Sequence, residues 1–266
     1  DTYGPKHTPL FVDGLNIHTH EPVKWVSPEG ERWILSNLAS QQNLFRTLDG
    51  LSTITGRQAA MEAIKYAFEN LRSPNGLLYW GGTTAYDAQK DQVCGDKNEY
   101  LKAFYPYYGL MWRVNPQVTE QFIESLWSSH VLDWSNLAMN RVGPTDRLSV
   151  SKGWDHEYKG GPVFFECDLG RLSFFNTGTD LICAAAWLTK ESGEKGPLVW
   201  ARRLAKRYVD TRHPNTGISY LMYTKPPYVA MDSYDDILMK FVPGTTDFLV
   251  LQRYKSSSKT MQPVDD

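Results

Sequence analysis

The pattern of hydrophobic and polar positions predicts helices from residue 38 onward. Apolar residues recur at helical spacing across residues 38–55, which end at Gly56: Leu44, Leu48, Leu51 and Ile54. Residues 57–72 carry a second apolar face before a turn at residues 73–76: Ala60, Ile64, Ala67, Phe68 and Leu71. Recurrence every three or four residues indicates an amphipathic helix, and glycine is typical just after a helix ends. The two segments predict a helical hairpin.

The same arrangement occurs twice more. Residues 181–191 and 197–211 form a pair that is interrupted at Ser192-Gly193, and residues 213–217 resemble the turn at 73–76. Residues 105–114 and 118–134 form another pair, joined at Asn115-Pro116. Three hairpins with similar turn and helix-end sequences indicate a repeat architecture. Because long loops separate them, we predict a mainly α fold: an incomplete or compact α/α toroid of about three helical hairpins, with short strands in the loops and tail.

We expect a single domain over residues 1–266. The proline-rich residues 1–36 predict an irregular lead-in or short strands, residues 37–223 contain the hairpins, and residues 224–266 form a tail. An apolar run at residues 248–251 predicts an edge strand in that tail. The long loops at 81–100 and 135–180 are the expected place for function, because loops on a rigid scaffold usually carry it.

Charge and composition exclude several classes. The chain has 266 residues and a net charge of −2, which does not suit a general nucleic-acid binder. No stretch of 18 apolar residues occurs, so we expect no membrane insertion. The first residues contain no basic start and no apolar run, so no signal peptide is expected within this chain. The 9 Trp, 15 Tyr and 11 Phe suit a groove that stacks flat ligands such as sugar rings.

The three cysteines form no CxxC pair, which disfavours a thiolate zinc site and a disulfide framework. We predict buried free thiols, and the apolar run at residues 181–186 suits such a place for Cys183.

Several segments carry candidate ligands. His18 and His20 would point to one side of an extended strand, beside Glu21, and would offer metal-binding nitrogens, although a structural role in the lead-in is the stronger interpretation. In the loop after the first hairpin, Trp80 and Tyr86 would offer stacking faces, and glycines would allow a ligand to approach the backbone. Carboxylates in the same loop suit a divalent cation, or simply a solvated acidic loop: Asp87, Asp91, Asp96 and Glu99.

Two later segments mix charge with aromatic rings. Arg141 follows Asn140 and could clamp a carboxylate, because guanidinium pairs bidentately with planar anions. The loop at 153–161 combines an imidazole, acids, a cation and an aromatic face: Trp154, Asp155, His156 and Lys159. A histidine beside acids suits a general base or a ligand. No GxSxG, P-loop, GxGxxG or HExxH motif occurs, which weakens the readings as serine hydrolase, NTPase, Rossmann protein or zincin.

Taken together, these segments resemble bacterial pectate-lyase-like proteins with an α/α-toroid fold, and polysaccharide lyase family 2 most of all. The resemblance covers roughly residues 10–223. It rests on residues 13–16, 19–22, 37–43, 78–82, 105–108, 133–141 and 154–156.

The resemblance implies β-elimination in a uronic-acid polymer. In this family an arginine removes the proton at C5, and a divalent cation neutralises the adjacent carboxylate. The resemblance places Arg141 at the base position and makes Glu99 the acidic ligand of Ca²⁺ or Mn²⁺; a rebuilt metal site would take its other ligands from Asp87, Asp91 and His156. It implies an acidic polysaccharide or oligosaccharide as partner, no organic cofactor, and a secreted or periplasmic location.

Two positions depart from the family pattern. Thr83 and Val142 stand where histidine ligands are expected, which puts the metal site in doubt. Free arginine also has a pKa above 12, so a basic role needs unusual surroundings.

Two other functions therefore stay open. One is a glycoside hydrolase on a similar scaffold, with Asp87 and Asp155, or Glu99, as paired carboxylates. The other is a noncatalytic carbohydrate-binding protein that has lost its metal ligands.

Overall fold

The structure is a computed structural model. It describes residues 7–27, 29–81, 84–95, 98–101, 104–146, 153–166, 172–218, 220, 222–225 and 262–263.

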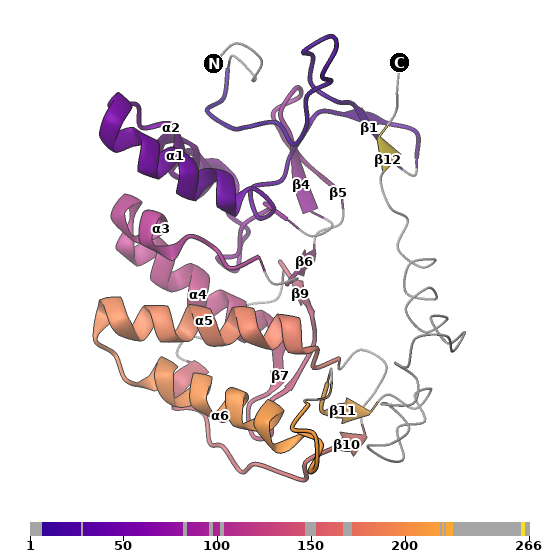
Figure 1. Cartoon of the computed structure of the whole chain (residues 1–266), viewed down its shortest axis with the longest axis vertical. Helices are drawn as coiled ribbons and strands as arrows, with labels where there is room; N and C mark the ends of the chain where they lie inside the picture. The colour runs from indigo at the N-terminus through magenta and orange to yellow at the C-terminus, as the bar shows by residue number, and fades with distance from the viewer. Residues whose placement is uncertain are drawn as a thin grey trace.

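Six α-helices form three successive pairs in the part of the chain that the structure describes. They are α1 (Gln42–Thr55), α2 (Ala59–Asn70), α3 (Tyr108–Val114), α4 (Pro116–His130), α5 (Phe175–Ser192) and α6 (Gly196–Asp210). The two helices of each pair contact each other, and α2 contacts α3 as α4 contacts α5. The pairs are stacked in sequence order along the long axis of the molecule (Figure 1). This confirms a mainly helical fold built from three hairpins.

The helix ends follow the sequence signals closely. Gly56 and Gly193 adopt the left-handed conformation that glycine accepts without steric cost, with φ of 70° and 77°. The side chain of Asn115 accepts a hydrogen bond from the Val118 amide and so caps α4, in which Pro116 occupies the first turn. Some boundaries differ from the prediction. α5 begins at Phe175, before the predicted start, and α4 ends at His130, where a short strand takes over.

The predicted apolar face is right for α2, but in α1 only Leu48 of the four predicted residues packs against the core. All five predicted residues of the α2 face are buried. In α1, by contrast, Ile54 is 81% exposed and Leu44 and Leu51 are also exposed. The buried residues of α1 are Phe45 and Gln42, whose side-chain oxygen accepts a hydrogen bond from the Tyr107 amide at 2.6 Å. Hydrophobicity alone therefore selected the wrong side of the helix, because a tertiary hydrogen bond rewards burial of the glutamine.

Much of the aromatic content lies in the core. Trp80, Trp127 and Trp200 are among the largest fully buried side chains. The ring of Trp134 lies 4.8 Å from that of Trp200 and 5.8 Å from that of Trp127, so aromatic packing links α4 to α6.

Short strands gather at one end of the helices (Figure 1). β1 (Trp25–Val26) pairs with β2 (Arg32–Trp33) and β12 (Gln262–Pro263), and β4 (Thr84–Asp87) lies between β3 (Leu35–Ser36) and β5 (Gln92–Gly95). Two two-stranded ladders join distant segments: β6 (Asn98–Tyr100) with β9 (Val142–Pro144), and β10 (Phe165–Glu166) with β11 (Thr224–Lys225). A third, local ladder pairs β7 (Val131–Asp133) with β8 (Ala138–Met139). The edge strand predicted at residues 248–251 lies outside the described residues.

The cysteines correct one expectation. Cys94 is buried and free, as predicted, but Cys183 is exposed. The apolar run around Cys183 is one turn and a half of α5, so successive residues point in different directions and Cys183 faces away from the core. Cys167 lies outside the described residues. Within those residues, no helix is long and apolar enough to cross a membrane.

Candidate functional site

The ladder between β6 and β9 joins two of the predicted site segments. Glu99 stands opposite Gly143, and Tyr100 stands opposite Val142. The Leu101 amide extends this pairing by donating to the Arg141 carbonyl at 3.1 Å. Backbone pairing therefore brings Glu99 next to the Arg141 segment, although the two residues lie far apart in the sequence.

The side chain of Arg141 is partly exposed and packs on an aromatic ring. Its guanidinium carbon lies 5.1 Å from the centroid of the Phe174 ring, immediately before α5. A guanidinium over an aromatic face is favoured by the negative charge of the ring face.

His130, which the sequence analysis missed, holds the Arg141 segment from beneath. Its Nδ1 lies 2.8 Å from the Asn140 carbonyl oxygen, and its own carbonyl accepts from the Asn140 amide at 2.9 Å. Because a carbonyl only accepts, Nδ1 carries the proton. The opposite nitrogen, Nε2, is buried, has no hydrogen-bond partner among the described residues, and faces Gly143. No local signal marked His130, because the sequence pattern predicts a helix that continues to residue 134, whereas α4 ends at His130.

Burial makes His130 neutral. Loss of solvation lowers the pKa of the imidazole to about 4, and the hydrogen bond to the Asn140 carbonyl opposes this shift only in part. Near neutral pH, His130 is therefore a fixed hydrogen-bond donor that orients residue 140 and the strand that follows it. The Asn140 side chain adds to this order, because its Oδ1 accepts from the Val142 amide at 3.3 Å.

The loop at 153–161 packs against the turn that follows β7. The amide of Lys159 donates to the Ser135 carbonyl at 2.8 Å, and the His156 ring lies 5.1 Å from the Trp134 ring. Asp155 and Lys159 are exposed, and the Lys159 ammonium lies 3.5 Å from the Glu157 carboxylate. The loop thus presents charged groups to solvent beside the turn that leads to Arg141.

The predicted stacking residues are largely core residues. Trp80 is 1% exposed and packs edge-on against Phe122. Trp154 is 8% exposed, packs against Trp127, and its carbonyl accepts a hydrogen bond from the Trp200 indole. Their rings offer no open face to a sugar in this structure, because the indoles contribute more to the core than to a surface.

Tyr86 and Gly81 likewise have structural roles. Tyr86 is 4% exposed, and its hydroxyl bonds to Tyr66 and to Asp91. A Cβ on Gly81 would lie 2.2 Å from the Cβ of Ala39, so this glycine permits a backbone to approach rather than a ligand. Gly82 and Thr83 lie outside the described residues.

The described side chains do not assemble a cation site. Asp87 is fully buried, and its Oδ1 accepts from the backbone amides of Gln89 and Ile34, which fixes a turn. His18 and His20 are exposed in a tight turn rather than in the extended segment that was expected, because the Asn16 side chain accepts from the amides of residues 18 and 19. Nowhere in the described residues do three His, Cys, Asp or Glu side chains form a group that could hold a metal ion. The side chain of Glu99 and residue Asp96 are outside the description.

Three helical hairpins with short strands at one end define a class of mainly helical repeat scaffold. Within that class, the family model described as periplasmic pectate lyase matches residues 8–239, and the chain belongs to this family. It is also 34% identical over 232 residues to the pectate disaccharide-lyase of Dickeya dadantii (strain 3937). That match covers 82% of this chain and 43% of the relative, so the chain spans less than half of that protein's length.

Proposed function

We propose that this chain is a pectate lyase that cleaves a uronic-acid polymer by β-elimination. Membership of the periplasmic pectate lyase family carries the proposal, together with the name of the Dickeya relative as a lyase of pectate. The ladder that brings Glu99 to the Arg141 segment supports it. We also propose a periplasmic location, and an open part of an α/α toroid as the arrangement to which the three hairpins belong.

In this reaction a base removes the proton at C5 of a uronate residue, and the C4–O bond breaks with its electron pair. A double bond forms between C4 and C5, and the departing oxygen takes up a proton. Arg141 is our candidate for the group at the C5 proton, and its guanidinium also suits the neighbouring carboxylate. Asn140, Asp155, His156 and Lys159 are candidates for contacts with substrate, because they lie in the same segment or in the loop beside it. The buried side chains of Trp80, Tyr86 and Trp154 would contribute indirectly, by holding these loops in place.

The family implies a divalent cation, with Glu99 as one ligand. Because the described side chains do not gather a set of ligands, we assign no step to that ion. Its participation stays a prediction, and chelation tests it.

Polygalacturonate with added Ca²⁺ or Mn²⁺ should yield an unsaturated product that absorbs in the ultraviolet. Arg141→Ala should lower the rate by about a hundredfold or more, as removal of one preorganised charged group does in other sites. Arg202→Ala is the matched control, since Arg202 is exposed on α6. Adding and removing chelator in the same assay measures the dependence on metal.

The other functions give different outcomes. Reducing sugar without an unsaturated product would indicate a hydrolase, for which Asp87 is poorly suited because it is buried in a turn. Oligosaccharide binding in a calorimeter without any product would indicate a noncatalytic protein. If no uronate polymer yields an unsaturated product in this assay, the proposal of lyase activity is wrong.

A further inference from the structure

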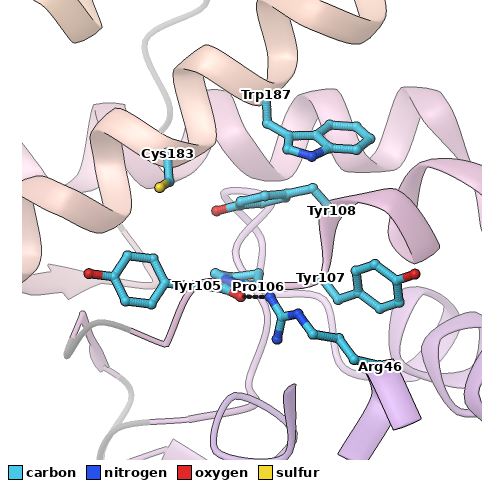
Figure 2. A pocket seen from close by; sticks show the side chains of 7 residues that line it. All are labelled: Arg46, Tyr105, Pro106, Tyr107, Tyr108, Cys183 and Trp187. Atoms are coloured by element: carbon cyan, nitrogen blue, oxygen red, sulfur yellow. Dashed lines mark hydrogen bonds between the residues drawn. The ribbon is translucent and has the colours of Figure 1, made fainter. Parts of the chain in front are cut away.

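A pocket of about 300 Å³ opens on the face of the helices, between α1, the segment that leads into α3, and α5. Four aromatic side chains line it together with Arg46 and Cys183: Tyr105, Tyr107, Tyr108 and Trp187. In the view of Figure 2, Trp187 and Tyr108 lie on one side and Arg46 on the other, with Tyr105 and Tyr107 to the left and right. None of these residues was expected to bind substrate.

The pocket is cationic. Among the described residues that line it, Arg46 alone carries a formal charge at neutral pH. The nearby Asp49 carboxylate is held by the Arg113 guanidinium at 2.6 Å and by the Tyr107 hydroxyl at 2.7 Å, which together lower the pKa of Asp49 against the opposing effect of burial. Asp180 accepts from the amides of Phe104 and Tyr105. Both neighbouring carboxylates thus accept hydrogen bonds within the protein, and the charged side chain that lines the pocket itself is Arg46, which favours an anion as ligand.

Arg46 is itself held in place. One terminal nitrogen donates to the Tyr105 carbonyl at 2.5 Å, the other donates weakly to the Asn43 side-chain oxygen at 3.5 Å, and the guanidinium carbon lies 5.3 Å from the centroid of the Tyr107 ring. A guanidinium has five N–H donors in a fixed plane, so a group positioned in this way has further donors to offer a carboxylate.

Tyr105 is held in a conformation that bulky residues rarely adopt. Its φ is 46°, in the left-handed region, and its side chain is 41% exposed. The Asp180 carboxylate binds its amide at 2.9 Å, and the Thr179 hydroxyl accepts from its phenol at 3.1 Å, so three contacts of α5 and Arg46 secure the residue. A conformation of this kind costs free energy and persists where the surroundings over-determine it, which is common at ligand-binding sites.

The pocket lies farther along the same helix that begins at the Arg141 site. Phe174, under the Arg141 guanidinium, precedes α5, and Cys183 follows nine residues later. At the rise of an α-helix this separation is about 13 Å, a distance that a few residues of an extended polysaccharide span.

We propose that this pocket is a second binding site for a uronate residue of the polysaccharide, distal to the Arg141 site. Arg46 pairs with the sugar carboxylate, and the exposed ring of Tyr105 and the half-buried ring of Trp187 pack against the C–H face of the sugar. The identity of the ligand rests on the proposed function, whereas occupancy of the pocket does not.

Cys183 reports on occupancy directly, because it is exposed and lines the pocket. Burial and the neighbouring Asp180 raise the pKa of its thiol, so alkylation should be run at mildly alkaline pH, where more thiolate forms. Cys94 is buried and its pKa is raised to about 12, and Cys167→Ser removes the remaining thiol. The rate of alkylation of Cys183 by iodoacetamide is then measured with and without oligogalacturonate. The measurement is repeated in an Arg141→Ala background, in which the ligand should be cleaved more slowly.

Oligogalacturonate at ten times its dissociation constant should slow the alkylation of Cys183 about tenfold, and a neutral galacto-oligosaccharide should not. Arg46→Ala should raise the dissociation constant about tenfold or more through loss of a charged hydrogen bond, so that protection at the same concentration falls to about twofold or less, and Tyr105→Ala should also weaken it. Arg202→Ala should leave it unchanged.

An unchanged rate of alkylation at concentrations that saturate lyase activity would overturn the second site and leave the lyase intact. Equal protection by the neutral oligosaccharide would overturn the role of Arg46. Protection without any unsaturated product would overturn the lyase and leave the second site intact.

Discussion

At the scale of single residues, the backbone at Gly143 packs directly against the buried ring of His130, next to the Arg141 segment. A Cβ on Gly143 would lie 2.6 Å from Nε2 of His130. The imidazole cannot retreat without giving up its bond to the Asn140 carbonyl, and it is surrounded by protein on all sides. The residue opposite Glu99 must therefore be glycine, because any side chain would push β9 away from the buried ring.

Gly143→Ala should lower the free energy of unfolding by about 1–3 kcal/mol, the usual cost of overpacking a rigid interior, and should reduce lyase activity. Gly50→Ala is a control that should change the free energy of unfolding in the opposite direction. Gly50 lies in α1 with nothing within 4 Å of the added Cβ, so alanine should stabilise the protein by about 0.5–1 kcal/mol. Chemical denaturation of both variants checks this, and a neutral Gly143→Ala would show that the ring has room to move.

At the scale of elements, α1 and α2 form a hairpin in which the two helices are buried to very different degrees. α2 has its whole predicted apolar face in the core, whereas α1 leaves three of its predicted apolar residues exposed. The two helices are similar in hydrophobic pattern, so the difference comes from how each is oriented on the rest of the molecule.

The same substitution on both helices measures this difference. Ile64→Ala in α2 should cost about 2–5 kcal/mol, because Ile64 is 1% exposed and truncation leaves a cavity. Ile54→Ala in α1 should change the free energy of unfolding by less than about 0.5 kcal/mol, as exposed positions do. Equal losses for the two variants, measured by urea denaturation, would contradict the burial described for α1.

At the scale of the whole molecule, the buried neutral His130 couples stability to pH. Its pKa is about 4 in the folded protein against 6.5 for the free side chain, so between these values the unfolded chain binds the additional proton. The contribution of His130 to the free energy of unfolding is therefore fully present above pH 6.5 and is lost as the pH is lowered toward 4, by an amount on the order of 3 kcal/mol.

His130→Asn should flatten this dependence, because the amide can still donate to the Asn140 carbonyl but does not titrate. His18→Asn is the matched control at an exposed position and should leave the slope unchanged. Thermal unfolding between pH 4 and pH 7 gives the comparison. A slope that is the same in the His130→Asn variant and in the parent would assign the acid sensitivity to other groups.

The sequence by itself determined the hairpins, because helix periodicity, Gly56, Gly193 and the Asn115-Pro116 junction are local signals. It also carried the family resemblance, which the matched family confirms over residues 8–239. These features depend on neighbours in the chain, so a linear pattern is enough to find them.

Only the tertiary structure decided which rings face inward and which residues meet. Trp80 and Trp154 were expected at the surface and lie in the core, while Tyr105 and Trp187 line a pocket. The roles of His130 and Gly143 depend on a strand pairing between β6 and β9 that no local pattern specifies. Burial and long-range pairing depend on the packed chain, because each is set by segments that are distant in sequence. For this reason the number of aromatic residues could be read from the sequence, but not which of them are buried.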